Sequence, residues 1–405
     1  MSTSIDGSTL LPFFTRKRIE NPDSISGRVQ REVHARYLSK RAQNVIPSDG
    51  ELQDLSTALS DCSPAVAGLQ FVTYDQLRTI AKSKSLPRSL RSFFSASAFL
   101  SLPRDAEERV SLAAFFSFLV DSVNLQQTQL LLGECDELGT GFLTEAQVQT
   151  YVGKTAMPYL ENYLGSSGWK GEDFLKFYAV TISRRFMIEL DLNGIGKIAI
   201  HTLFMSDIFL DYQYTLKNPN STGKGLDAAS AMRLYQNYAG LDTDADGMLS
   251  RTDLAGFAGG AISPVIVSRA FEEMQSFGRQ LDYKGYLDFA IVMENKGKPH
   301  SVKYLFTLLD IAKKKYLTRA DLLYQIHAVL SNVYERRPDL NRINPHDMAD
   351  EIFDMITPVC SKSITLKDLL NSKAAAVVLG LLTDANDLYH YENRENYLHA
   401  NNTSN

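Results

Sequence analysis

Residues 241–254 read LDTDADGMLSRTDL, and this stretch decides the fold. Aspartates stand at alternate positions 242, 244 and 246, a glycine follows at 247, and a further aspartate stands at 253. Carboxylates spaced in this way around a tight glycine turn can point at one centre. The pattern therefore predicts a loop between two helices that binds a hard cation through oxygen atoms.

The spacing is that of an EF-hand loop, which takes ligands from positions 1, 3, 5, 7, 9 and 12 and needs glycine at position 6. The predicted ligands are carboxylates, one backbone carbonyl and one hydroxyl, supplied by Asp242, Asp244, Asp246, Met248, Ser250 and Asp253. The alternative is an aspartate-rich turn that only caps the next helix. Repulsion among four crowded acids without a cation argues against that alternative.

The last ligand position holds Asp253 where a glutamate is usual. Because aspartate is one methylene shorter, it is expected to offer one oxygen instead of two. The loop is therefore predicted to be a single weak Ca²⁺ site, with a dissociation constant of roughly 10⁻⁵ M or poorer, at which Mg²⁺ competes.

Similar helix–loop–helix units recur along the chain. They begin at Asp136 (DELGTGFLTEAQ), Asp191 (DLNGIGKIAIHT) and Asp310 (DIAKKKYLTRAD), and weaker copies occupy 279–289 and 362–370. The repeats predict an all-α protein of tandem EF-hand-like units in two helical halves, with very short β pairings between loops. The 242 loop is expected to pair with the loop carrying Leu281, and the 310 loop with the one carrying Ile364.

The other loops lack metal ligands. The 310 loop has Ala312 at position 3 and lysines at 313–315, which place a cation where a ligand should be. The 136 loop offers Leu138 at position 3, and the 191 loop offers Ile195 at position 5. These loops are predicted to serve packing and to bind no metal.

Helical patterns are predicted over Gly27–Arg41, Asp105–Val123, Ala228–Ala239 and Asp347–Ile356, with apolar residues three and four apart. The stretch 213–226, which contains KNPNSTGKG, is the predicted linker. It would separate an N-terminal helical half at 46–212 from a C-terminal EF-hand half at 227–395. A basic arm at 1–45 and a tail at 396–405 complete the predicted domains.

Composition narrows the function. The chain has 405 residues and a net charge of −5, so neither charge nor a basic run indicates nucleic-acid binding. No apolar run is long enough to span a bilayer, and the N-terminus lacks the pattern of a secretory signal. Three widely separated cysteines favour reduced thiols in the cytoplasm.

Charge is concentrated at the N-terminus. Residues 1–45 hold eight Lys or Arg against four acids, so this segment carries +4. A solvated helix and a docking arm for an acidic partner both explain this segment. No nucleotide-binding, metalloprotease or nucleophile-elbow motif occurs in the sequence, so no enzyme activity is predicted.

Several longer segments go beyond EF-hand spacing: FYAVTISRRFMIELDLNGIGKIAI (177–200), MRLYQNYAGLDTDADGMLS (232–250), LDYKGYLDFAIVMEN (281–295), KYLFTLLDIAKKKYLT (303–318) and EIFDMITPVCSKSITLKDLLNS (351–372). In order and spacing, over roughly residues 10–396, the chain resembles the B″ regulatory subunits of protein phosphatase 2A, gamma branch.

The resemblance implies a non-catalytic, calcium-binding subunit that associates with the phosphatase scaffold and catalytic subunits. Such subunits direct the holoenzyme to substrates or to microtubule and centrosomal structures. The implied location is the cytoplasm, at the cytoskeleton or centrosome, with the nucleus as an alternative. The competing hypothesis is an autonomous EF-hand calcium sensor or cytoskeletal scaffold without a phosphatase.

Overall fold

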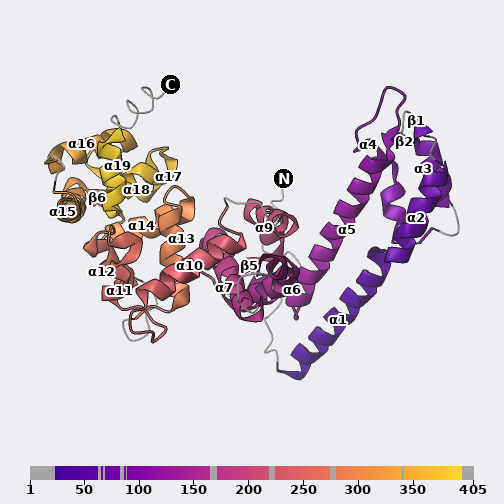
Figure 1. The fold of residues 1–405 in the computed structure, drawn as a ribbon, viewed down its shortest axis with the longest axis horizontal. Coiled ribbons are helices and arrows are strands. Elements are labelled where there is room, and N and C mark those ends of the chain that lie inside the picture. Colours follow the sequence, from indigo (N-terminus) through magenta and orange to yellow (C-terminus); the bar gives the residue numbers. More distant parts are fainter. Residues whose placement is uncertain are drawn as a thin grey trace, which may run out of the picture. The chain divides into compact units, whose positions relative to one another are not determined.

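The computed structural model describes residues 23–62, 65–66, 69–82, 86–87, 89–164, 171–218, 224–273, 280–338 and 342–394. Helices dominate this part of the chain (Figure 1), which confirms the all-α prediction. The chain forms two compact units. The first comprises Met1–Tyr151 with Lys197–Met205, and the second comprises Val152–Gly196 with Ser206–Asn405.

The first unit is built on two long helices, α1 and α5, which pack against each other (Figure 1). Buried leucine and phenylalanine side chains from α2, α3 and α5 form its core. The bounds of its elements are α1 Ile25–Val45, α2 Asp49–Cys62, β1 Ala65–Val66, β2 Leu69–Val72, α3 Tyr74–Lys82, η3 Arg91–Phe94, α4 Ala96–Leu100, β3 Val110–Ser111, α5 Leu112–Cys135, β4 Phe142–Thr144, β5 Lys197–Ala199 and α8 Ile200–Phe204.

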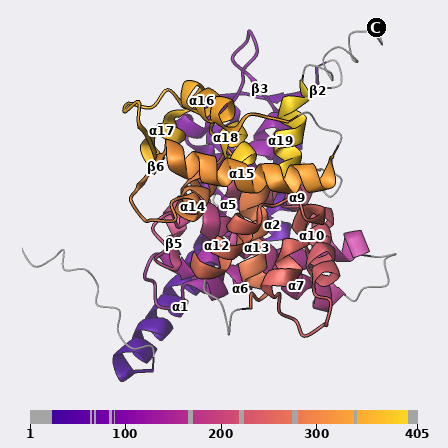
Figure 2. The same ribbon diagram turned by 90° about the vertical axis from the view of Figure 1, so that its left-hand side faces the viewer.

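Helix α6, Glu145–Leu164, begins in the first unit and continues into the second. In the second unit α15 crosses α18 and α19 (Figure 2), over one apolar core that runs from α10 to α19. Its elements are α7 Gly171–Leu190, α9 Asp207–Lys217, α10 Ala228–Leu241, α11 Arg251–Ala255, η4 Phe257–Gly259, α12 Pro264–Glu273, α13 Tyr283–Glu294, α14 Pro299–Leu309, β6 Tyr316–Thr318, α15 Arg319–Arg336, α16 Pro345–Ile356, β7 Ser363–Thr365, α17 Leu366–Asn371, α18 Ala375–Thr383 and α19 Ala385–Glu392.

The loops pair as the sequence predicts. Leu249 and Leu281 exchange two backbone hydrogen bonds, with N···O distances of 2.7 and 2.9 Å. Strands β6 and β7 place Leu317 opposite Ile364. All four side chains are buried, so each loop pair is closed by backbone bonding and by apolar contact together. Both pairing predictions are confirmed.

One predicted helix needs correction, and one sheet was not predicted. The predicted helix at 105 begins only at Leu112, because the Asp105 carboxylate accepts the backbone N–H groups of Glu107 and Arg109 and folds this segment into a turn. The backbone bond from Arg109 is the main cause that lowers the pKa of Asp105. A three-stranded sheet of β1, β2 and β3 was not predicted.

The predicted domain division also differs from the structure. Helix α9 extends through Lys217 into the predicted linker, because Phe209, Tyr212 and Thr215 continue its buried face. Beyond residues 219–223, which lie outside the described part, Leu226 is buried and its carbonyl accepts a hydrogen bond from Tyr178. Residues 152–196 belong to the same compact unit as the C-terminal half. The predicted tail at 396–405 lies outside the described residues.

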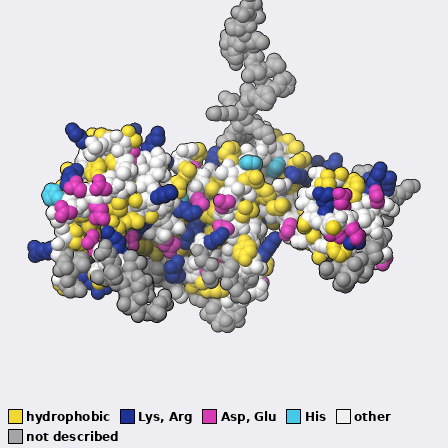
Figure 3. Space-filling model, turned by 90° about the horizontal axis from the view of Figure 1, so that it is seen from above, with side chains coloured by type: hydrophobic (Ala, Val, Ile, Leu, Met, Phe, Trp, Pro, Cys, Tyr) yellow, Lys and Arg dark blue, Asp and Glu magenta, His cyan; other side chains and the backbone are white. Residues whose placement is uncertain are grey.

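Acidic and basic side chains are interspersed on the molecular face in Figure 3, and no field of a single sign covers that face. Among the described helices, none combines the length and the apolar character needed to cross a membrane.

The Leu249–Leu281 contact predicts a large stability loss on truncation. Leu281→Ala should lower the free energy of unfolding by about 2–5 kcal/mol, because it leaves a cavity in the core between two loops. Urea denaturation measures this difference. Val359→Ala, at a fully exposed position, is the matched control and should change stability by less than about 0.5 kcal/mol. Equal midpoints for the two variants would contradict the closure argument.

Candidate metal centre in the 242–253 loop

Helix α10 delivers the first ligand of the loop. Asp227 caps the start of this helix by accepting the Ser230 N–H, and Asp242 directly follows its last residue, Leu241. The Tyr238 hydroxyl donates to the Gly247 carbonyl at 2.5 Å and so fixes the turn from inside. Burial and the Asp242 carboxylate raise the pKa of Tyr238 to about 12, so the hydroxyl remains a donor at neutral pH.

The tight turn depends on left-handed backbone. Gly247 has a φ of +78° and Ala245 a φ of +55°. Glycine reaches such angles without the clash that a Cβ brings, which explains why position 6 is glycine. The turn brings the carboxylates of Asp242, Asp244 and Asp246 together, with one oxygen of each within 4.8 Å of the others.

The electrostatics of this triad favour a cation. Unit charges about 4 Å apart repel by roughly 1 kcal/mol in water and about 4 kcal/mol near a protein surface. Backbone N–H groups offset part of this repulsion: Gly247 donates to Asp242 at 3.0 Å and Met248 to Asp246 at 2.8 Å. Asp242 Oδ1 is buried and has no hydrogen-bond partner among the described residues. The donor set and this orphaned oxygen both fit a hard divalent ion.

The last predicted ligand is engaged elsewhere. Ser250 and Asp253 form a capping box at the start of α11, in which Asp253 Oδ2 accepts the Ser250 N–H at 2.8 Å and its hydroxyl at 2.6 Å. The Thr243 hydroxyl donates to Asp253 Oδ1 at 3.1 Å. The Ser250 hydroxyl bond is the main cause that lowers the pKa of Asp253. The structure thus groups three of the predicted ligands, Asp242, Asp244 and Asp246, while metal coordination by all six predicted residues remains a prediction.

Sequence reasoning missed one contact of the site. Gln280 donates from Nε2 to Asp246 Oδ2 at 3.1 Å. This residue immediately precedes Leu281, so the loop pairing itself brings it beside the carboxylates. A weak signal existed, because the pairing prediction already placed the neighbour of Leu281 next to the metal loop.

The 310 loop follows the same backbone path, with φ values of +53° at Lys313 and +68° at Lys315. Asp310 accepts the backbone N–H groups of Lys314 and Lys315 at 2.9 and 2.6 Å, as Asp242 does with Gly247. The Lys314 ammonium lies 2.7 Å from the carboxylate of Asp321, which occupies position 12. This ion pair raises the pKa of Lys314, chiefly through the hydrogen bond to Asp321. A side-chain cation thus neutralises the acid that a metal would meet.

The turns of the 136 and 191 loops close on their first aspartates, and the two loops pair with each other through strands β4 and β5. Asp136 accepts from the N–H groups of Thr140 and Gly141, and Asp191 from those of Ile195 and Gly196. Across the described ranges, the 242 triad is the cluster of acids close enough to hold an ion.

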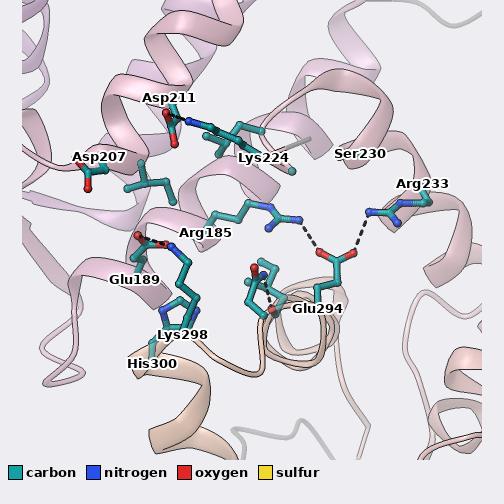
Figure 4. Close-up of a pocket in the computed structure, with 15 residues that line it drawn as sticks. Arg185, Glu189, Asp207, Asp211, Lys224, Ser230, Arg233, Glu294, Lys298 and His300 are labelled. Carbon is teal, nitrogen blue, oxygen red and sulfur yellow. Dashed lines mark hydrogen bonds and ion pairs between the residues drawn. The ribbon is translucent and has the colours of Figure 1, made fainter. Parts of the chain in front are cut away.

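The helix that enters the metal loop is anchored by ion pairs across three helices (Figure 4). Glu294 at the end of α13 accepts Arg185 from α7 at 2.9 Å and Arg233 from α10 at 3.0 Å. Arg184 pairs with Asp288, which lies earlier on α13. Helices α7, α10 and α13 are thereby tied together.

Arg185, Arg233 and Glu294 line a cavity of about 590 Å³ in the second unit (Figure 4). Lys224 pairs with Asp211 and Lys298 lies 3.9 Å from Glu189, so the wall is balanced in charge. Burial, together with Lys298 and Arg185, lowers the pKa of His300 to about 4, so its imidazole is neutral at physiological pH. The cavity therefore lies within a structural ion-pair network.

The backbone that follows the metal loop is held in a different way from helix α10, which enters it. After α11, Ala258, Gly259 and Gly260 have φ values of +52°, +66° and +81°. The side-chain amide of Asn332 on α15 donates to the carbonyls of residues 260, 261 and 262 at 3.1–3.3 Å. The incoming helix is thus fixed by ion pairs, whereas the outgoing helix ends in a left-handed bend held by two side chains of α15, the Asn332 amide and the Arg336 guanidinium, which donates to the Gly259 carbonyl.

The fold and the loops define a protein of the tandem EF-hand-like class, with one loop whose acids converge. No protein-family model matches the chain. Curated relatives do. The chain is 31% identical over 396 residues to the gamma member of the B″ regulatory subunits of protein phosphatase 2A from Rattus norvegicus, with 96% of this chain and 84% of the relative covered. The human protein of the same name is 30% identical with the same coverage.

A more distant relative is TON2 of Arabidopsis thaliana, a probable B″ regulatory subunit of protein phosphatase 2A, which is 26% identical over 96% of this chain and 83% of that protein. Among solved structures, a chain of a PP2A PR70 holoenzyme has a TM-score of 0.51 at 21% identity, and the match covers 60% of this chain and 91% of that one. This likeness shows a shared fold. The chain belongs to the family of B″ regulatory subunits of protein phosphatase 2A.

The 310 loop, in which Lys314 pairs with Asp321, yields a prediction about how a metal site could be gained. Ala312→Asp, Lys314→Asp and Lys315→Gly together would give the 310 loop the ligand pattern of the 242 loop. Isothermal titration with Ca²⁺ should then show one more ion per chain than the wild type binds. Lys314→Gln, which removes the cation but adds no ligand, is the control and should leave the stoichiometry unchanged. An unchanged stoichiometry in the triple variant would contradict the interpretation that side chains alone prevent this loop from binding a metal ion.

Proposed function

We propose that this chain is a non-catalytic B″-type subunit that binds the scaffold and catalytic subunits of protein phosphatase 2A and directs the holoenzyme to substrates. The observation that carries the proposal is identity of 30–31% to B″ gamma subunits along 96% of the chain. Such coverage includes both compact units, so the proposal concerns the whole chain and not one shared module.

We further propose that the 242–253 loop binds one Ca²⁺ ion weakly, with Mg²⁺ as a competitor. The converging triad and the orphaned oxygen of Asp242 support the site. Asp253 already accepts three hydrogen bonds, so its recruitment as a ligand would compete with the capping box. A bound ion would supply positive charge that removes the repulsion among the three carboxylates.

The anchoring of the two helices suggests what the ion does. Helix α10 is fixed to α7 and α13, so binding is not expected to swing it outward as in a calcium sensor that opens. Ion binding would instead fix α11 and the bend at 258–260 against α15. The proposed role is therefore to stiffen a docking surface of the second unit.

The resemblance also supports a location in the cytoplasm, at microtubule or centrosomal structures, with the nucleus as an alternative. Immunofluorescence of the tagged full chain together with a centrosome marker tests this part of the proposal. Diffuse staining without enrichment at the centrosome or at microtubules would contradict the cytoskeletal address.

Holoenzyme assembly has a direct test. Purified chain should bring down purified scaffold and catalytic subunits of protein phosphatase 2A in the presence of Ca²⁺. Chelation should weaken the complex, because the repelling carboxylates no longer organise α11. Asp242→Ala with Asp244→Ala should weaken it as well, because the ion loses two of its ligands. Asp191→Ala, in a loop without converging acids, is the matched control for the metal effect.

The outcomes of this experiment separate the hypotheses. No recovery of either phosphatase subunit under any condition would favour an autonomous sensor or scaffold. Equal recovery of the phosphatase subunits with and without chelator would show that assembly does not depend on the ion. The proposed regulatory role would still stand.

Position 12 yields a prediction for the affinity. Asp253→Glu should strengthen Ca²⁺ binding by roughly tenfold and favour Ca²⁺ over Mg²⁺, because the longer acid reaches the ion with two oxygens and can still cap α11. Asp253→Asn removes the charge at similar size and should weaken binding. Isothermal titration measures both constants. Equal affinity in all three proteins would show that position 12 does not coordinate the ion.

A further inference from the structure

Helix α1 in the first compact unit has one face packed against α5. Leu38 is buried, and its side chain lies over Gly133 of α5, where a Cβ would stand only 3.1 Å from Leu38 Cδ2. The His34 ring is hydrogen-bonded to the Gly133 carbonyl at 3.1 Å, and Gln30 donates to the Leu138 carbonyl at 2.5 Å. Close approach at a glycine together with these two bonds fixes which side of α1 faces inward.

The opposite face carries an exposed apolar ridge, defined as Ile25, Val29, Val33 and Tyr37. Their exposed fractions are 76%, 56%, 62% and 59%, although each is a large hydrophobic residue. Residues four apart lie in one row along a helix, and such rows interlock with the grooves of a second helix in the commonest type of helix packing. A continuous row of four differs from a scatter of single apolar residues, which needs no explanation.

The charges beside the ridge are basic. Glu32 is neutralised by Arg36 at 2.7 Å. Arg28 and Lys40, near the two ends of the ridge, form no ion pair within the described part of the chain. They are twelve residues apart, which corresponds to about 18 Å along the helix axis. The surface therefore offers an apolar row with an unsatisfied cation near each end.

We propose that the ridge of α1 is a docking surface for an acidic α-helix of a partner protein. That helix would carry apolar residues at four-residue spacing and acids about twelve residues apart, which would pair with Arg28 and Lys40. A second copy of this chain is disfavoured, because two helices with a basic excess would repel each other. A membrane surface is disfavoured, because α1 has apolar residues on two opposite faces and lacks one wide apolar side. The proposal goes beyond the proposed function, since it depends on neither the metal loop nor the phosphatase.

Two synthetic helical peptides test the charge requirement. Both carry leucines at four-residue spacing; one has glutamates and the other lysines at the flanking positions. Fluorescence anisotropy with the full chain should show that the glutamate peptide binds at least tenfold more tightly than the lysine peptide. Its affinity should fall as salt rises, because the end contacts are between exposed charges. Equal binding of the two peptides, or no binding of the glutamate peptide, would overturn the proposal.

Variants of the chain locate the surface. Val29→Ser with Val33→Ser should weaken binding of the glutamate peptide roughly tenfold, as expected when apolar contacts at the centre of an interface are lost. Val120→Ser, at a half-exposed valine on α5, is the matched control and should bind like the wild type. Arg28→Glu with Lys40→Glu should reverse the preference toward the lysine peptide.

The same variants distinguish a partner helix from the two other possible occupants of the ridge, a second copy of this chain and a membrane surface. All of them should melt at the wild-type temperature, since the altered side chains are exposed. Concentration-dependent dimerisation in sedimentation that Val29→Ser with Val33→Ser abolishes would identify a second copy as the occupant and overturn the proposal. Binding to anionic vesicles that is lost in that same variant would overturn it in favour of a lipid surface.

Discussion

The exchange of two backbone hydrogen bonds between Leu249 and Leu281 is the constraint on which the second unit depends. A loop of the EF-hand type leaves its own backbone groups unpaired at its eighth position, and burial of those groups without partners is costly. Pairing two loops satisfies both and buries both leucines at once. The helices that enter and leave the loops then have fixed directions, so α10 and α13 meet α7 where Glu294 can receive two arginines.

The 242 and 310 loops differ in how the negative charge of their acidic side chains is balanced. Each closes a turn on its first aspartate, and each places an acid at position 12. In the 310 loop the Lys314 ammonium neutralises Asp321, so the acid at position 12 already has a positive partner. In the 242 loop three carboxylates converge and one buried oxygen has no partner in the described part of the structure. The difference between the two loops therefore lies in three side chains and not in the backbone path.

Local chemistry explains which predictions were confirmed. The loop pairings followed from an aliphatic residue at a fixed distance from the first aspartate, because the contact at position 8 is set by loop geometry. The helix predicted from Asp105 began too early, because an aspartate side chain can hold a turn as readily as it can cap a helix. The predicted linker at 213–226 was placed by its polar composition, whereas Phe209 and Tyr212 extend the buried face of α9 into it.

The sequence by itself determined the helix–loop–helix repeats, the loop with converging acids and the lysines that stand at ligand positions of the 310 loop. These are properties of residues within about twelve positions of one another. Only the tertiary structure decided that α7 belongs with the C-terminal half, since Arg185 and Glu294 are 109 residues apart. It also decided that Asp253 is held in a capping box and that four apolar residues of α1 face outward. The physical reason is that contacts between distant segments depend on how helices pack, and composition and spacing do not fix that packing.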